Sequence, residues 1–152
     1  MLFAASTGDI FKGTLLMTYN QMNGSLRLSL DPVSADLFSD KALEAARLCT
    51  NKLCNKPAQL RRFYDELVMW HDKVFAVKTP EGQLEKFKAL EPFIQMIRAK
   101  AAYAKGRKLI DDAFYELINE MIRQVRTPAQ LKTAKLFFEA FLGYMKYLEQ
   151  TK

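Results

Sequence analysis

The sequence offers few side chains that could carry out a reaction. It contains one histidine, His71, and two cysteines, Cys49 and Cys54, so a Ser-His or Cys-His catalytic pair would depend on that single imidazole. These three side chains cannot complete a four-ligand zinc site without a carboxylate, and the C-x4-C spacing does not match a redox C-x-x-C motif. We therefore interpret His71 as a core or boundary residue and the cysteines as reduced, partly buried thiols.

Paired carboxylates and phosphate-binding loops are the next features to consider. Asp65-Glu66 and Asp111-Asp112 are adjacent in the chain, and adjacent residues point to different faces of a helix. Asp111-Asp112 also stand where a helix is expected to begin, a position that favours acids. The six glycines are scattered and form no glycine-rich phosphate loop. We expect no catalytic residues, no bound metal and no cofactor.

One segment combines cations with an aromatic ring in a pattern typical of nucleic-acid binding. No acidic residue occurs between Glu91 and Asp111, although five basic residues fall there. On a helix, Lys100, Tyr103 and Arg107 lie within about 60° of one another, with the two cations about 10 Å apart along the axis. Such cations can neutralise phosphates, and the tyrosine can stack on a base or bond to a sugar.

A second basic cluster stands at the expected start of a helix at Pro57, and consists of Lys52, Lys56, Arg61 and Arg62. A helix N-terminus presents free N–H groups and partial positive charge, which suit a phosphate. Basic clusters of this kind are more often solvated surfaces than binding sites. The 23 Lys and Arg against 17 Asp and Glu give a net charge of +6, which permits a polyanionic partner without requiring one.

These residues lie on a long helical body. From Asp31-Pro32 onward apolar side chains recur with the 3.6-residue period, and prolines punctuate the pattern. The sequence predicts an all-α bundle of about five helices joined by short loops, with Pro92 starting or kinking the second half of the third. The expected helices run from Ser34 to Cys49, Pro57 to about Phe75, Gly82 to about Gly106, Leu109 to Arg126, and Pro128 to about Leu148.

The first 30 residues differ from this helical body. Thr14 to Leu30 contain Asn23-Gly24, a strong turn signal, with apolar and polar residues alternating on either side. They are expected to form a β-hairpin, with an irregular extended arm as the alternative. We thus expect residues 1–30 to be a hairpin or extended segment and residues 31–152 to be one helical-bundle domain.

Length and composition fit one ordinary globular domain. A chain of this size buries about 68–70% of its unfolded surface, so it needs no disulfide or metal to fold. No apolar run approaches the roughly 18 residues that a membrane-spanning helix needs. The stretch before Gly13 lacks a basic flank and reads poorly as a signal peptide. The sequence predicts a soluble, cytoplasmic protein without membrane contact.

Three stretches resemble one protein family. They are Asn51-Lys52-Leu53 with Gln59-Leu60-Arg61-Arg62-Phe63-Tyr64-Asp65-Glu66-Leu67, then Leu90 to Arg107 with its Lys-x-x-Tyr-Ala-x-Gly-Arg block from Lys100, and Phe137-Phe138-Glu139-Ala140-Phe141. Together they are similar to the small helical subunit of type III-A CRISPR effector complexes, the Csm small subunit, over about Leu43 to Leu148. Cys54 to Ala58 replace the usual hydroxyl-rich cap of that family, and the first 30 residues have no counterpart.

The resemblance implies a structural role rather than a reaction. Members of this family are non-enzymatic, lie in several copies along a guide-RNA filament and contact guide and target RNA. Their partners are a backbone subunit that cuts the target, a polymerase-like subunit and, as we expect, further copies of themselves. By resemblance the RNA-binding candidates are Arg61, Lys100, Tyr103 and Arg107, joined through proximity and charge by Lys52, Lys56, Arg62 and Lys108. Such a subunit would read RNA shape and charge, because base pairing supplies the sequence.

Two other functions remain open at this point. A helical protein–protein adaptor could dock its basic face on an acidic protein surface, with a salt-sensitive association rate and no RNA binding. An enzyme with an unfamiliar site would depend on His71, and its activity would disappear in a His71→Ala variant.

Overall fold

The structure, a computed structural model, describes residues 28–150, which contain α2 (Asp40–Cys49), α3 (Pro57–Phe75), α4 (Pro80–Gly106), α5 (Asp112–Arg123) and α6 (Pro128–Gln150). Over these residues there is no β-strand, and the predicted all-α bundle is confirmed. The predicted hairpin around Asn23-Gly24 lies outside the described residues, apart from its last positions, where Leu28 and Leu30 are buried and Ser29 is exposed. None of the described helices is both long and apolar enough to cross a membrane.

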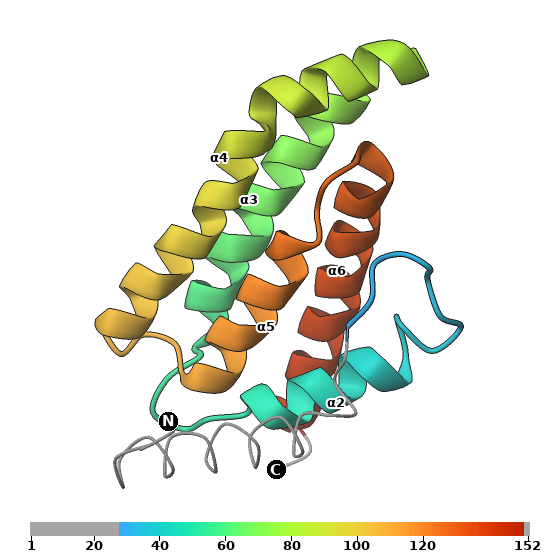
Figure 1. Cartoon of the computed structure of the whole chain (residues 1–152). Helices are drawn as coiled ribbons and strands as arrows, with labels where there is room; N and C mark the ends of the chain where they lie inside the picture. The colour runs from blue at the N-terminus through green and yellow to red at the C-terminus, as the bar shows by residue number, and fades with distance from the viewer. Residues whose placement is uncertain (1–27, 151–152) are drawn as a thin grey trace, which may run out of the picture.

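Two packed pairs, α4 with α5 and α3 with α6, are joined where α3 packs against α4, and the short helix α2 lies across one end. α3 and α4 run antiparallel along one side, α5 packs against α4, and α6 packs against α3, as Figure 1 shows. α2 crosses the end of α6 and also touches α5. Because α3 and α4 are antiparallel, the first turn of α3 and the last turn of α4 lie at the same end of the bundle.

Phenylalanine rings form the centre of the core. Phe114 of α5 is fully buried, and its ring centroid lies 5.7 Å from that of Phe63, 6.1 Å from that of Phe138 and 5.9 Å from that of Phe141. Edge-to-face and offset contacts at these distances stabilise aromatic pairs beyond the area they bury. The cluster therefore joins α3, α5 and α6 through one ring.

Prolines begin three of the helices, and two of these starts, at Pro57 and Pro128, were predicted. Pro57, Pro80 and Pro128 each stand at the first helical position, where the missing N–H has no helical partner. Ahead of α4, the Thr79 hydroxyl accepts a hydrogen bond from the Gly82 N–H at 3.1 Å. Thr79-Pro80 is thus the start of α4 rather than only the end of the preceding segment, and α4 begins two residues before the predicted Gly82.

The bounds of two further predicted helices were wrong. α2 begins at Asp40 rather than Ser34, because residues 35–39 form turns that nevertheless bury Leu37. α4 is continuous through Pro92, so this residue does not start a separate helix; it is exposed, and the carbonyl group that its ring leaves without a donor can face water. α5 is shorter than predicted at both ends and begins at Asp112.

Candidate nucleic-acid interface

The two basic clusters, which are far apart in the sequence, meet at one end of the bundle. The loop before α3 is bonded to the loop after α4: the Asn55 N–H donates to the Leu109 carbonyl, and the Asp111 N–H donates to the Asn55 side-chain oxygen, both at 3.0 Å. Asn51 adds a third bond, from its side-chain amide to the Asp111 carboxylate at 3.1 Å. Both loops lie side by side at the lower left of Figure 1.

Asn55 is the residue that holds this junction together. It is 4% exposed, and its side-chain amide also donates to the Cys49 carbonyl at 2.8 Å. Its φ of 57° lies in the left-handed region, which Asn tolerates better than most residues. Asn55 therefore combines a left-handed backbone conformation with hydrogen bonds from both the oxygen and the nitrogen of its side-chain amide.

Replacing Asn55 by alanine is expected to destabilise the fold by about 1–3 kcal/mol, because buried partners lose their hydrogen bonds. Asn55→Gly is the matched variant, since glycine accepts the left-handed backbone but cannot make those bonds. Urea unfolding should rank the stabilities as wild type, then Asn55→Gly, then Asn55→Ala. An alanine variant as stable as the wild type would mean that the junction contributes nothing to the fold.

The predicted stripe on α4 exists, and its tyrosine and arginine contact each other. Tyr103 is 66% exposed, and the Arg107 guanidinium donates to its hydroxyl at 3.3 Å while lying 5.8 Å from the ring centroid. Lys100, one turn earlier, reaches across to α3, where its amine lies 2.8 Å from the Glu66 carboxylate. The acid-free block therefore has an acidic neighbour that is 34 residues away in the sequence.

Arg62 lies beside this stripe. It is exposed, and it precedes Glu66 by four residues, so both point to the same side of α3. Since α3 and α4 are antiparallel, the turn of α3 before Glu66 lies beside the turn of α4 after Lys100. We call Arg62, Lys100, Tyr103 and Arg107 the basic face.

Two other cations of the central block are used within the fold. Arg98 donates to the Asn119 side chain at 2.8 Å, and Lys105 pairs with Asp112 at 2.8 Å, so both connect α4 to α5. The hydrogen bond that the Lys105 ammonium donates to the Asp112 carboxylate raises the pKa of Lys105. These two side chains, on another side of α4, are separate from the basic face.

Lys108 ends α4 in a conformation that glycine would adopt more readily. The Leu109 N–H donates to the Ala104 carbonyl and the Lys108 N–H to the Lys105 carbonyl, which places Lys108 at the left-handed position of a Schellman motif, with φ of 63°. Its side chain is exposed and makes no contact with charged or polar groups of residues 28–150. The chain thus keeps a free lysine where the backbone favours glycine.

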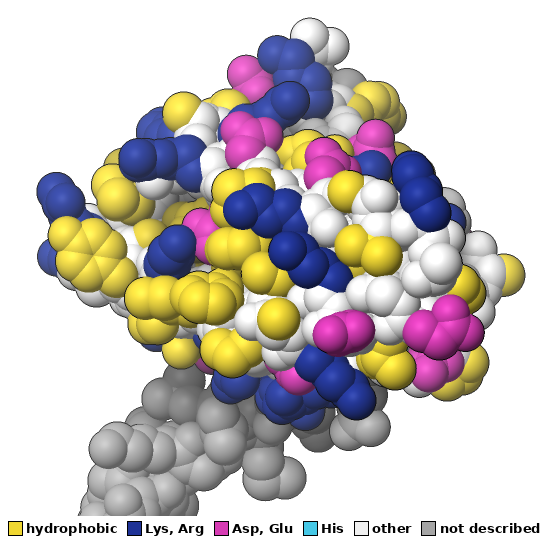
Figure 2. All heavy atoms as spheres, turned by 90° about the horizontal axis from the view of Figure 1, so that it is seen from above, with side chains coloured by type: hydrophobic (Ala, Val, Ile, Leu, Met, Phe, Trp, Pro, Cys, Tyr) yellow, Lys and Arg dark blue, Asp and Glu magenta, His cyan; other side chains and the backbone are white. Residues whose placement is uncertain are grey.

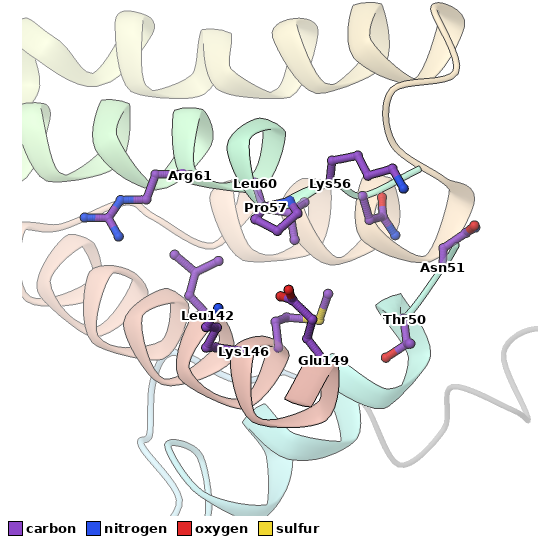
Figure 3. Close-up of a pocket in the computed structure, with 11 residues that line it drawn as sticks. Thr50, Asn51, Lys56, Pro57, Leu60, Arg61, Leu142, Lys146 and Glu149 are labelled. Atoms are coloured by element: carbon purple, nitrogen blue, oxygen red, sulfur yellow. The ribbon is translucent and has the colours of Figure 1, made fainter. Parts of the chain in front are cut away.

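Lys56 and Arg61 lie on the other side of α3, around a pocket of about 420 Å³ between α3 and α6. Leu60, Leu142 and Met145 line it, with Lys146 and Glu149 from the end of α6. In Figure 3 the Lys56 amine and the Arg61 guanidinium point away from the middle of the pocket, whereas the Glu149 carboxylate points toward Pro57. The start of α3 therefore has a carboxylate of α6 on one side and the cations Lys56 and Arg61 on the other.

The predicted candidates thus lie at one end of the bundle, with the basic face on one side of α3 and Lys56 and Arg61 on the other. Lys56 donates to the Lys52 carbonyl at 2.8 Å, and Arg61 lies 3.4 Å from Asp65, which leaves these cations partly engaged. Arg62, the Lys52 amine and Lys108 have no polar partner within the described part of the chain. On the face seen in Figure 2, Lys and Arg side chains are scattered among hydrophobic and acidic ones.

The residues that could do other chemistry are in structural positions. His71 is largely buried, with its ring 4.6 Å from Phe75 and Nδ1 3.0 Å from the Asp72 carboxylate, as expected of a boundary residue. Both cysteines are free, and burial raises the pKa of the Cys49 thiol far above its ordinary value, with the Asp111 charge acting in the same direction. Asp111 caps α5 by accepting from the Phe114 N–H at 2.9 Å. Among residues 28–150 no group of three His, Cys, Asp or Glu could hold a metal ion.

Comparison with known proteins identifies the family. No curated protein and no solved structure matches the chain. The family model described as Csm2 Type III-A matches residues 33–151, which covers every described helix and the basic face. The chain therefore belongs to the Csm2 family and is a structural small subunit of a type III-A CRISPR effector complex.

Proposed function

We propose that the subunit is non-enzymatic and binds the backbone of guide and target RNA, in several copies along the complex and in the cytoplasm. Its partners would be the backbone and polymerase-like subunits and neighbouring copies of itself. The observation that carries this proposal is the basic face, where exposed cations from α3 and α4 surround an exposed tyrosine. Family membership supports the setting, because a type III-A complex contains other subunits and RNA.

The basic face has the chemistry to contact RNA without reading its sequence. Lys100 and Arg107 are about 10 Å apart along α4, so they can neutralise separate phosphates. The Arg107 contact fixes the Tyr103 ring, whose exposed hydroxyl can bond to a ribose 2′-OH or a phosphate. These groups reach backbone atoms, which base pairing leaves accessible. Binding of a labelled single strand and a matched duplex by purified protein, with and without substitutions on this face, tests the proposal.

The Glu66 carboxylate should weaken RNA binding, because it neutralises part of the Lys100 charge. Replacing Glu66 by glutamine keeps an acceptor for the Trp70 indole N–H, which now donates to Glu66 at 3.3 Å. Glu66→Gln should tighten RNA binding by about two- to fivefold at low salt. Asp65→Asn, which removes the partner of Arg61 instead, is the matched control. A larger gain from Asp65→Asn would place the RNA on the pocket side of α3.

Replacing Lys108 by glycine should stabilise the fold but weaken RNA binding. Lys108→Gly relieves the left-handed backbone and should raise the free energy of unfolding by about 0.5–1 kcal/mol. The same change removes a free cation, so it should reduce the salt slope for single strands by up to about 0.7. Thermal unfolding and salt titrations of one preparation measure both quantities. RNA binding equal to the wild type would remove Lys108 from the interface.

A further inference from the structure

The middle of the α3–α4 surface carries large apolar side chains that no part of residues 28–150 covers. Phe93 is 53% exposed, Met96 is 54% exposed and Met69 is 41% exposed. The Phe93 ring stacks on Trp70 of α3, with centroids 5.8 Å apart and planes 26° apart. We call Met69, Trp70, Phe93 and Met96 the apolar patch.

The apolar patch continues the basic face along α4. Phe93, Met96, Lys100, Tyr103 and Arg107 follow one another at intervals of three and four residues, which places them on a single stripe of the helix. The apolar residues therefore occupy the middle of the α3–α4 surface, and the RNA-binding candidates occupy the end near the start of α3. Two different ligands could contact these two parts at the same time.

The rings of the patch are held in place before any partner binds. The Trp70 indole N–H donates to Glu66 at 3.3 Å, and the Lys73 amine lies 5.3 Å from the centroid of the indole ring. A side chain that is already fixed loses little conformational entropy when it is covered. Trp, Phe and Met are also enriched in protein interfaces, where a few such residues supply most of the binding free energy.

An RNA backbone would not match this patch. Phosphates and riboses present polar groups, and the bases of a duplex are stacked on one another, so neither offers an apolar surface to two thioethers and two aromatic rings. The patch matches the apolar side of a helix or a strand, which can pack on Trp70, Phe93 and Met96.

The charges around the patch specify the kind of protein surface. Lys73 of α3 and Lys86, two turns before Phe93 on α4, border it together with one exposed acid, Glu85, while the Glu66 carboxylate is paired with Lys100. The same face of a second copy would bring these lysines together, and like charges across an interface are unfavourable. Acidic side chains on the partner would instead complement them.

We propose that the apolar patch docks an acidic, amphipathic segment of another protein subunit of the complex. Apolar side chains of that segment cover Trp70, Phe93 and Met96, and its carboxylates meet Lys73 and Lys86. The docking is independent of the proposed RNA contacts, and it leaves Tyr103 and Arg107 free for RNA. In this way the same surface holds RNA beside a neighbouring subunit.

Co-expression of the full chain with the other protein subunits, without guide RNA, tests the docking. Phe93→Ser with Met96→Ser should reduce incorporation into the protein assembly at least about tenfold, because the truncated side chains form the centre of the contact. Both positions are more than half exposed, so the variant should fold, as circular dichroism can check. Tyr147→Ser, which removes a 56% exposed ring from α6, is the matched control and should incorporate normally. Normal incorporation of the Phe93/Met96 variant would overturn the proposal.

A photo-crosslinking amino acid at position 93 then identifies what covers the patch in the complete complex. The expected product joins position 93 to a segment of another subunit that contains acidic residues. Crosslinks to RNA, or to a second copy of this chain, would each overturn the proposal. RNA binding by the isolated Phe93/Met96 variant is measured separately and should equal that of the wild type. Because docking and RNA binding are measured separately, a failure of this inference can be distinguished from a failure of the proposed function.

Discussion

Replacing Lys100 and Arg107 together by alanine should reduce the salt slope of single-strand RNA binding by up to about 1.4, since each lost phosphate contact removes about 0.7. At about 0.1 M salt this change corresponds to roughly 25-fold weaker binding when counterion release is the only loss. The effect should be the same for unrelated RNA sequences, because the two cations contact the backbone. Salt titrations of wild type and variant with a labelled strand measure the slope directly.

A control with the same change in net charge separates the basic face from the total charge of the protein. Lys88→Ala with Lys132→Ala removes two exposed cations from other surfaces of α4 and α6. This variant should retain most of the wild-type affinity and slope. If the Lys100/Arg107 variant folds normally and keeps the wild-type slope, the basic face does not bind phosphate.

The largest expected effect on stability comes from Phe114, whose ring is fully buried between α3, α5 and α6. Phe114→Ala should destabilise the fold by about 3–5 kcal/mol, because it removes three ring contacts and leaves a cavity. That loss is a large part of the total for a domain, which is typically about 5–15 kcal/mol. Urea unfolding, followed by circular dichroism, measures the change.

Phe114→Leu is the matched variant for this test. It keeps most of the apolar volume but loses the aromatic contacts with Phe63, Phe138 and Phe141, so it should be less destabilising than alanine. Equal stability of wild type and Phe114→Ala would contradict the assignment of this ring to the centre of the core. Such a result would also contradict the role of this ring in linking α5 to α6.

The helical body was predictable because its signals are local. Proline and a following apolar period mark the starts of α3 and α6, and Thr127-Pro128-Ala129-Gln130 behaves as a capping sequence, with the Thr127 hydroxyl accepting from the Gln130 N–H at 3.2 Å. The start of α2 was predicted too early, since the buried Leu37 fits a helical period although its backbone forms turns. Burial of an apolar side chain therefore does not determine whether the local backbone is a helix or a turn.

The candidate site was predictable along α4 but not across the bundle. The spacing of Lys100, Tyr103 and Arg107 follows from helix geometry alone, whereas the Lys100 to Glu66 contact depends on how α3 packs against α4. The junction between Asn55 and Asp111 joins residues 56 apart and is likewise set by packing. Local sequence patterns carry no information on such pairs, so the division of the candidates between the basic face and the α3–α6 pocket required the structure.

The most direct test of the central claim is RNA binding by the purified full chain at several salt concentrations. A labelled single strand, its matched duplex and an unrelated strand are titrated between about 50 and 300 mM salt, a range over which phosphate contacts weaken steeply. We expect binding that is independent of sequence and falls with salt, for single strand and duplex alike. Absence of binding at the lowest salt, or an affinity that does not change with salt, would contradict it.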